Sequence, residues 1–181
     1  MPANLDKVIA CLKYLELTPN AHDYRGRFLM QKIAFLAKAL GMDISYHFTI
    51  YVAGPYSREL NREYFLDETK TRINSLQTDY VLQESDIVIL EKIKNCCKLE
   101  GEQQLMEATS TVVYLMKQKP DVSDDELFTQ MKWFKPHIRD TERIIAITKA
   151  KELLFRDEYM TDEIKREMDE WDRIDENHAT N

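Results

Sequence analysis

The chain has 181 residues, and its 25 Lys and Arg against 32 Asp and Glu give a formal net charge of −7. Hydrophobic residues make up 44% and charged residues 31%, which is typical of a globular domain and excludes a disordered or fibrous chain. The acidic total argues against a general polyanion binder. The charge is distributed unevenly, however, with +1 over residues 1–83, −3 over 84–160 and −5 over 161–181. The net charge therefore does not exclude a basic surface formed by the first half.

Nothing in the sequence predicts a membrane segment or a secretory leader. No apolar run reaches the ~18 residues of a spanning helix, and residues 1–17 are charged and amphipathic. The three cysteines, Cys11, Cys96 and Cys97, are odd in number and two are adjacent, which does not build a disulfide framework. We therefore expect a cytoplasmic protein with reduced thiols and no membrane partner.

Most of the chain has the pattern of amphipathic helices. Only 4 glycines and 5 prolines are present, which disfavours a turn-rich β fold. Apolar residues recur at helical spacing, and Ser57, Ser85 and Ser123 stand where N-caps would begin helices. The expected helices span residues 5–17, 24–40, 58–65, 68–76, 86–99, 102–117, 124–133 and 141–157.

Residues 45–52 have a different pattern. Tyr46, Phe48 and Ile50 alternate with other residues in an aromatic and β-branched segment, which predicts a half-buried strand that Gly54-Pro55 ends. Residues 79–83 are a candidate second strand, pairing with the first at long range. The predicted fold is mainly α with a small antiparallel β element, and the order of elements is compatible with a winged-helix-like N-terminal half.

The pattern predicts one mostly helical domain over residues 1–158, with helices and the β element in 1–83 and helices alone in 84–158. Residues 159–181 are expected to form an acidic amphipathic helix and tail. Met168 and Trp171 belong to its sparse apolar seam. This seam either packs on its own domain or docks into a partner's groove.

The residue patterns give no support to catalysis. The four histidines lack metal-ligand spacing, and the glycines form neither a dinucleotide-binding nor a phosphate-binding motif. No serine motif of a hydrolase is present. We therefore predict no enzyme activity, no catalytic residue, no metal site and no cofactor.

Basic and aromatic residues alternate in the first half. If its short helices converge, they could form a face that reaches nucleic-acid phosphates; the alternative is a solvated surface with salt bridges. Tyr24, Tyr51, Tyr56 and Tyr64 are interleaved with the basic residues. The candidate nucleic-acid-binding residues are Arg25, Arg27, Lys32, Arg58, Arg62 and Arg72.

Several motifs resemble the SocA-like antitoxin domain, also called Panacea, and more closely the YwgA-type family of prokaryotic proteins. The motifs are Gln31-Lys32 before an apolar helical stretch, an aromatic strand over 46–51, and Gly54-Pro55-Tyr56-Ser57 with Leu60 three residues on. Similar matches in the second half are Leu105-Met-Glu-Ala-Thr109 and Lys135-Pro136-His137. The chain departs from the pattern at Ala53, where the family usually has tyrosine.

The resemblance implies a compact helical fold and a non-catalytic binding protein, in some relatives an antitoxin or a proteolytic adaptor. The expected partner is therefore a protein, such as a toxin or a protease. Two alternatives remain: the protein is a winged-helix-like regulator that binds DNA, or it forms a homodimer. Tyr56, Ser57 and Arg58, at the Gly-Pro corner, and Met168 and Trp171, in the tail, are the candidate partner-binding residues.

Overall fold

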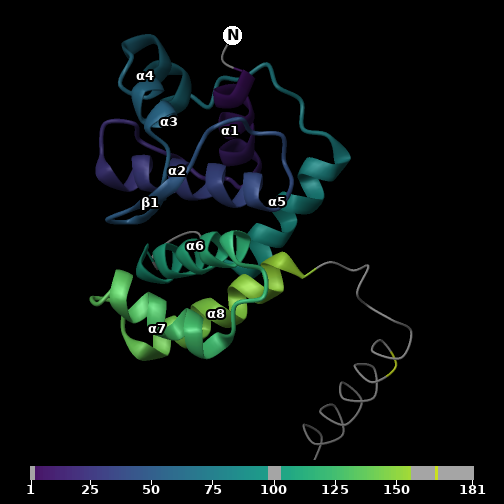
Figure 1. The fold of residues 1–181 in the computed structure, drawn as a ribbon. Helices are drawn as coiled ribbons and strands as arrows, with labels where there is room; N and C mark the ends of the chain where they lie inside the picture. The colour runs from purple at the N-terminus through teal and green to yellow at the C-terminus, as the bar shows by residue number, and fades with distance from the viewer. Residues whose placement is uncertain (1–2, 98–102, 156–165, 167–181) are drawn as a thin grey trace, which may run out of the picture.

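The computed structural model describes residues 3–97, 103–155 and 166. Within them the chain is mainly helical with one small antiparallel sheet, as predicted (Figure 1). None of the described helices is both long enough and apolar enough for a membrane span. The elements are α1 (Ala3–Tyr14), α2 (Tyr24–Ala39), β1 (Thr49–Tyr51), β2 (Gly54–Tyr56), α3 (Arg58–Glu63), α4 (Asp67–Asn74), α5 (Glu84–Cys96), α6 (Gln103–Gln118), α7 (Asp124–Phe134) and α8 (Asp140–Leu154).

Two of the predicted N-caps are confirmed. The Ser57 side chain accepts a hydrogen bond from the Leu60 N–H, and the Ser123 side chain accepts one from the Glu126 N–H. Each satisfies a backbone donor that the first turn of a helix leaves free. The start of α5 differs from the prediction, because Gln83 and not Ser85 is the N-cap residue.

The predicted long-range strand pairing is wrong. Gly54 and Pro55 do not end the sheet but form its second strand, which pairs with β1 in register Thr49 to Tyr56 and Tyr51 to Gly54. Residues 79–83 are not a strand. The physical reason is local. A two-residue connection brings β2 back beside β1, so backbone groups of β1 find their hydrogen-bond partners within one hairpin.

The helices form two layers with the hairpin near their boundary. The elements from α1 to α4 and the hairpin lie in the upper part of Figure 1, and α6, α7 and α8 lie below them. Helix α6 is central, since it packs against α2, α7, α8 and β2. Buried side chains from both layers join in one hydrophobic core, to which Ile33 of α2, Val112 of α6 and Ala146 of α8 belong. The hairpin is therefore held between α2 and α6.

Candidate functional site

The corner at Ser57 is fixed by a buried amide from α2. Gln31 is buried, and its Oε1 accepts a hydrogen bond from the Ser57 N–H at 2.7 Å. Its Nε2 donates to the Ser57 carbonyl at 2.9 Å and to the Tyr64 hydroxyl at 3.2 Å. A single side chain thus satisfies both backbone groups of the residue that caps α3, and this sets the direction in which the chain leaves the hairpin.

Two buried lysines hold the backbone of the hairpin. Lys32 of α2 is 2% exposed, and its Nζ donates to the Pro55 carbonyl at 2.9 Å. Lys135, which follows α7 and is 1% exposed, donates from its Nζ to the Tyr51 carbonyl at 3.0 Å and to the Val52 carbonyl. A buried ammonium is costly unless acceptors surround it, so the carbonyls of the hairpin and the two lysines stabilise each other.

Glu107 of α6 compensates part of this buried positive charge. Its Oε1 lies 2.9 Å from Lys135 Nζ and 3.2 Å from His137 Nε2. Arg143 of α8 fixes the same segment, because its guanidinium donates to the Lys135 carbonyl at 3.0 Å. The motifs of the first half and of the second half therefore meet around one hairpin.

Gly54 lets the hairpin approach α6 closely. Its φ of +89° lies in the region that side chains disfavour. An added Cβ would lie 2.9 Å from Thr111 Oγ1 and 3.2 Å from Lys32 Nζ. Backbone conformation and lack of space both require glycine here.

A cavity of about 380 Å³, which we call the aromatic pocket, opens between α2, the hairpin and α3. Four residues at its opening, which we call the rim, are strongly exposed, from 54% at Phe65 to 78% at Val52; the other two are Tyr24 and Tyr51. Tyr51 and Tyr56 stack with ring centroids 5.3 Å apart, and the Arg27 guanidinium lies over the Phe65 ring. The lining consists of Tyr24, Arg27, Phe28, Gln31, Lys32, Tyr51, Val52, Ala53, Gly54, Tyr56, Asn61, Tyr64 and Phe65.

The charge of the aromatic pocket is positive. Arg27 and Lys32 are its charged lining residues, and no carboxylate of the described residues lines it. The pKa of Lys32 is lowered to about 7, mainly by burial; the carboxylate of Glu107 partly opposes this shift, and the nearby charge of Lys135 adds to it. The pocket therefore combines aromatic surface with two cationic side chains, and the charge of Lys32 changes near neutral pH.

The predicted partner-binding residues have different positions. Tyr56 lines the aromatic pocket, and Arg58 is exposed at the start of α3. Ser57 is fully buried, so its contribution is the cap and the corner and not a contact surface. Met168 and Trp171 lie outside the described residues.

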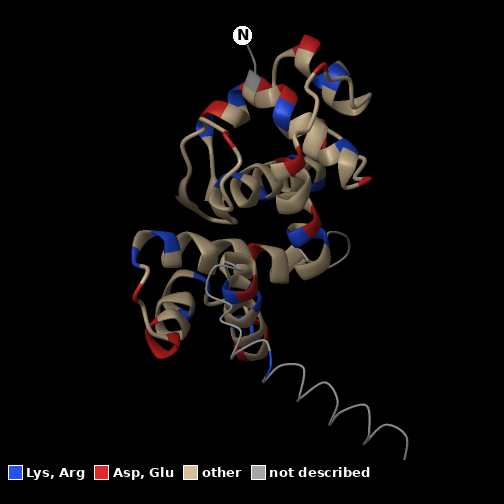
Figure 2. Ribbon diagram, turned by 90° about the vertical axis from the view of Figure 1, so that its right-hand side faces the viewer, with Lys and Arg blue, Asp and Glu red and all other residues tan. Residues whose placement is uncertain are grey.

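The predicted basic face is only partly assembled. The prediction that Lys32 belongs to a basic surface is wrong. Lys32 is buried against the hairpin and cannot reach a phosphate on a surface. Arg72 forms an ion pair with Asp6, and Arg27 is half-buried and donates to the Ala21 carbonyl. Figure 2 shows acidic and basic residues interspersed over the described elements, which matches the alternative of a mixed, salt-bridged surface.

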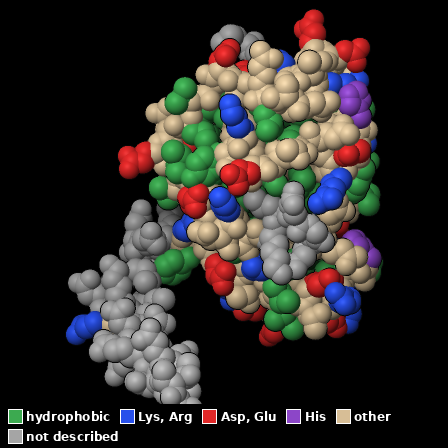
Figure 3. Space-filling view, turned by 180° about the vertical axis from the view of Figure 1, so that it is seen from behind, with side chains coloured by type: hydrophobic (Ala, Val, Ile, Leu, Met, Phe, Trp, Pro, Cys, Tyr) green, Lys and Arg blue, Asp and Glu red, His purple; other side chains and the backbone are tan. Residues whose placement is uncertain are grey.

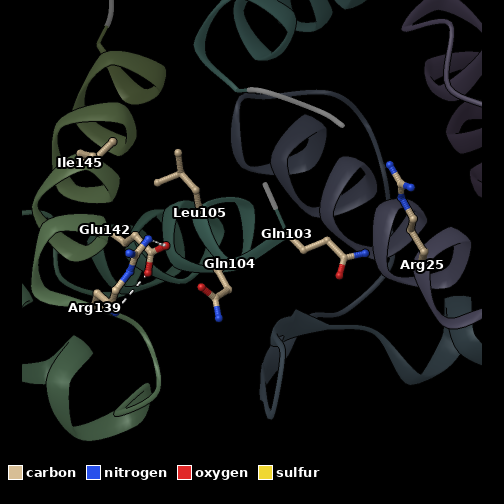
Figure 4. A pocket seen from close by; sticks show the side chains of 7 residues that line it. All are labelled: Arg25, Gln103, Gln104, Leu105, Arg139, Glu142 and Ile145. Carbon is tan, nitrogen blue, oxygen red and sulfur yellow. Dashed lines mark hydrogen bonds and ion pairs between the residues drawn. The ribbon is translucent and has the colours of Figure 1, made fainter. Parts of the chain in front are cut away.

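The remaining cations of that face, Arg25, Arg58 and Arg62, are exposed. Arg25 lines a second, more polar cavity of about 700 Å³. Figure 4 shows Arg25 across this cavity from Arg139 and Glu142, which pair with each other at 2.9 Å. The cation on the α8 side is thus already compensated, which makes this cavity a weaker anion site than its arginines suggest.

The aromatic residues that the sequence pattern groups together also lie together in the structure. All four tyrosines that alternate with basic residues, Tyr24, Tyr51, Tyr56 and Tyr64, line the aromatic pocket. Glu107, Lys135 and Phe65 were not singled out as site residues. The sequence does contain a signal that Lys32 is buried. It lies four residues from both Phe28 and Leu36 and hence on the apolar stripe of α2.

Within residues 3–97 and 103–155 and at 166, no group of three or more His, Cys, Asp or Glu residues could hold a metal ion. Neither a family model, a curated protein nor a solved structure matches this chain.

Proposed function

We propose that the protein is a non-catalytic binding module, antitoxin-like in its mode of action, that contacts a protein partner through the rim of the aromatic pocket. The main support is the group of exposed apolar side chains there. Tyr24, Tyr51, Val52 and Phe65 are 54–78% exposed and all line one concave site. Aromatic side chains around a pocket are typical of interface hot spots, where they supply large contact area at a small entropic cost.

Rigidity of the rim also supports this proposal. Gln31, Lys32 and Lys135 fix the backbone of the hairpin and of the corner after it. A side chain on such a support loses little conformational freedom when a partner binds, and preorganisation of this kind raises affinity. The face seen from behind in Figure 3 carries its apolar side chains in separate groups among charged residues.

DNA binding has less support than a protein partner. One of the six candidate cations is buried, one is paired with a carboxylate, and one is bonded to a backbone carbonyl. The remaining three are surface arginines, each with an acidic residue within two positions in the sequence. Sequence-independent affinity for DNA requires several free cations on one face.

Photo-crosslinking at one residue tests the proposed contact surface. A photoreactive amino acid is placed at Val52, which is 78% exposed, or at the control position Val81, which is 75% exposed. Val81 precedes α5, which lies on the opposite side of the molecule from β1 in Figure 1. Each variant is co-expressed with the product of the neighbouring gene.

We expect one crosslinked product of defined mass from position 52 and none from position 81. The Phe65→Ser variant should abolish it, because it removes a rim side chain without touching the hairpin. Equal labelling at both positions, or no labelling at position 52, would contradict the proposed contact surface. A shift of genomic DNA fragments at low salt that is lost at high salt would instead favour the DNA-binding alternative.

A further inference from the structure

We propose that the aromatic pocket binds a small aromatic carboxylate, with the ring between the tyrosine and phenylalanine side chains and the carboxylate at Lys32 and Arg27. This inference goes beyond the binding of a protein partner and does not require one. It concerns the interior of the pocket, whereas the proposed protein contact concerns the rim. Its support comes from the size, lining and charge of the cavity.

The size and the lining of the pocket suit a small ring. A volume of about 380 Å³ falls in the range of roughly 300–1,000 Å³ that small-molecule sites occupy. The walls carry rings from three parts of the chain, with Tyr24 and Phe28 on α2, Tyr51 and Tyr56 on the hairpin, and Tyr64 and Phe65 after α3. Rings arranged in this way offer stacked and edge-to-face contacts to an aromatic guest.

The charged groups select an anion over a cation. Lys32 is 2% exposed, and an ammonium has three N–H donors. In the described part of the chain, one of these donors has an acceptor, the Pro55 carbonyl. Glu107, the carboxylate that acts on Lys32 electrostatically, forms its ion pairs with Lys135 and His137 instead. A carboxylate in the pocket would therefore satisfy free donors of a buried cation, which is a strong interaction in a dry site.

The affinity of such an anion should depend on pH. Burial holds the pKa of Lys32 near 7, so its charge is largely lost between pH 6 and pH 8. Among the described residues, Glu107 from α6 and Lys135 from the segment after α7 act on its charge, His137 pairs with Glu107, and Arg27 of α2 lines the same pocket. Burial raises the pKa of the surrounding tyrosines, so they stay protonated over this range: Tyr24, Tyr56 and Tyr64. If only the ammonium form binds, the affinity falls about tenfold from pH 6 to pH 8.

Calorimetric titration with phenylacetate and with phenylacetamide, its neutral isostere, tests this proposal on the full chain. We expect saturable binding of the acid at pH 6 with a Kd below about 1 mM, at least tenfold weaker binding of the amide, and about tenfold weaker binding of the acid at pH 8. Equal affinity for acid and amide would overturn the proposal, because the pocket would then recognise shape without charge. Absence of saturable binding of the acid would overturn it as well.

Three variants locate the binding site. Tyr24→Ala removes a ring that is 60% exposed, so it should fold normally and weaken binding of the acid at least fivefold. Lys32→Met should weaken the preference for the acid over the amide, and Arg27 accounts for what is left of it. Phe155→Ala, an exposed ring at the end of α8, is the control and should bind as the parent protein does. If Lys32→Met does not fold, Tyr24→Ala decides: an unchanged affinity in that variant would place the ligand elsewhere and refute the proposal.

Discussion

Replacing Gly54 by alanine tests whether the hairpin has to lie directly against α2 and α6. The substitution has two costs. The first is conformational, because φ is +89° at this residue and an L side chain is strained there by about 1–2 kcal/mol. The second is steric, because the new Cβ would lie 2.9 Å from Thr111 Oγ1 and 3.2 Å from the buried Nζ of Lys32. Displacing such buried neighbours costs about 1–3 kcal/mol more.

Gly41 provides a matched control for the conformational cost. Its φ is +115°, and an added Cβ would meet nothing within 4 Å. Gly41→Ala should therefore lower the free energy of unfolding by the strain alone, about 1–2 kcal/mol. Gly54→Ala should lower it by about 2–5 kcal/mol, the sum of strain and displacement.

Urea denaturation of both variants, followed by far-UV circular dichroism, measures the difference. We expect Gly54→Ala to be less stable than Gly41→Ala by about 2 kcal/mol, with similar m values. If the two variants agree within ~0.5 kcal/mol, the close approach of the hairpin to Thr111 and Lys32 does not contribute to stability, which would refute the reasoning.

The other predictions also concern the support of the site. Gln31→Ala removes three buried hydrogen bonds and should lower the free energy of unfolding by about 2–4 kcal/mol in urea melts, whereas the exposed Gln118→Ala should change it by less than ~0.5 kcal/mol. Lys32 has a pKa of about 7 when folded, against about 10.4 when unfolded, so the unfolded state binds more protons between these values. The parent protein should therefore gain about 2 kcal/mol relative to Lys32→Met from pH 7 to pH 9, and a flat difference would contradict the burial of the ammonium. Ser123→Ala removes an N-cap and should lower the melting temperature through a loss of about 1 kcal/mol, and no shift would mean that the cap is not formed in solution.

The helices could be predicted because their signals are local. Apolar spacing and caps such as Ser57 and Ser123 depend on residues within one or two turns, and the structure confirms them. The hairpin could not be predicted in the same way. Its turn is Val52-Ala53 and its second strand begins with Gly54-Pro55, a pair that usually ends a strand.

The burial of Lys32 and Lys135 against the hairpin was still harder to predict. Lysine is almost always exposed, so sequence rules place Lys32 and Lys135 at the surface. Their burial depends on carbonyls of a hairpin that is distant in sequence, Tyr51 and Pro55, and on Glu107 for charge. No local pattern contains that information, although the position of Lys32 on the apolar stripe of α2 hints at it. The tyrosines of the pocket were recognised as a group because aromatic residues stand out in the sequence.

The two lysines that hold the hairpin come from opposite ends of the described chain, Lys32 from α2 and Lys135 from the segment between α7 and α8. During synthesis, residues up to Phe65 supply every side chain that lines the aromatic pocket, but Lys135 is added much later. A growing or truncated chain that lacks Lys135 thus leaves the Tyr51 and Val52 carbonyls without this donor. The backbone support of the pocket is therefore complete only when both layers have folded together.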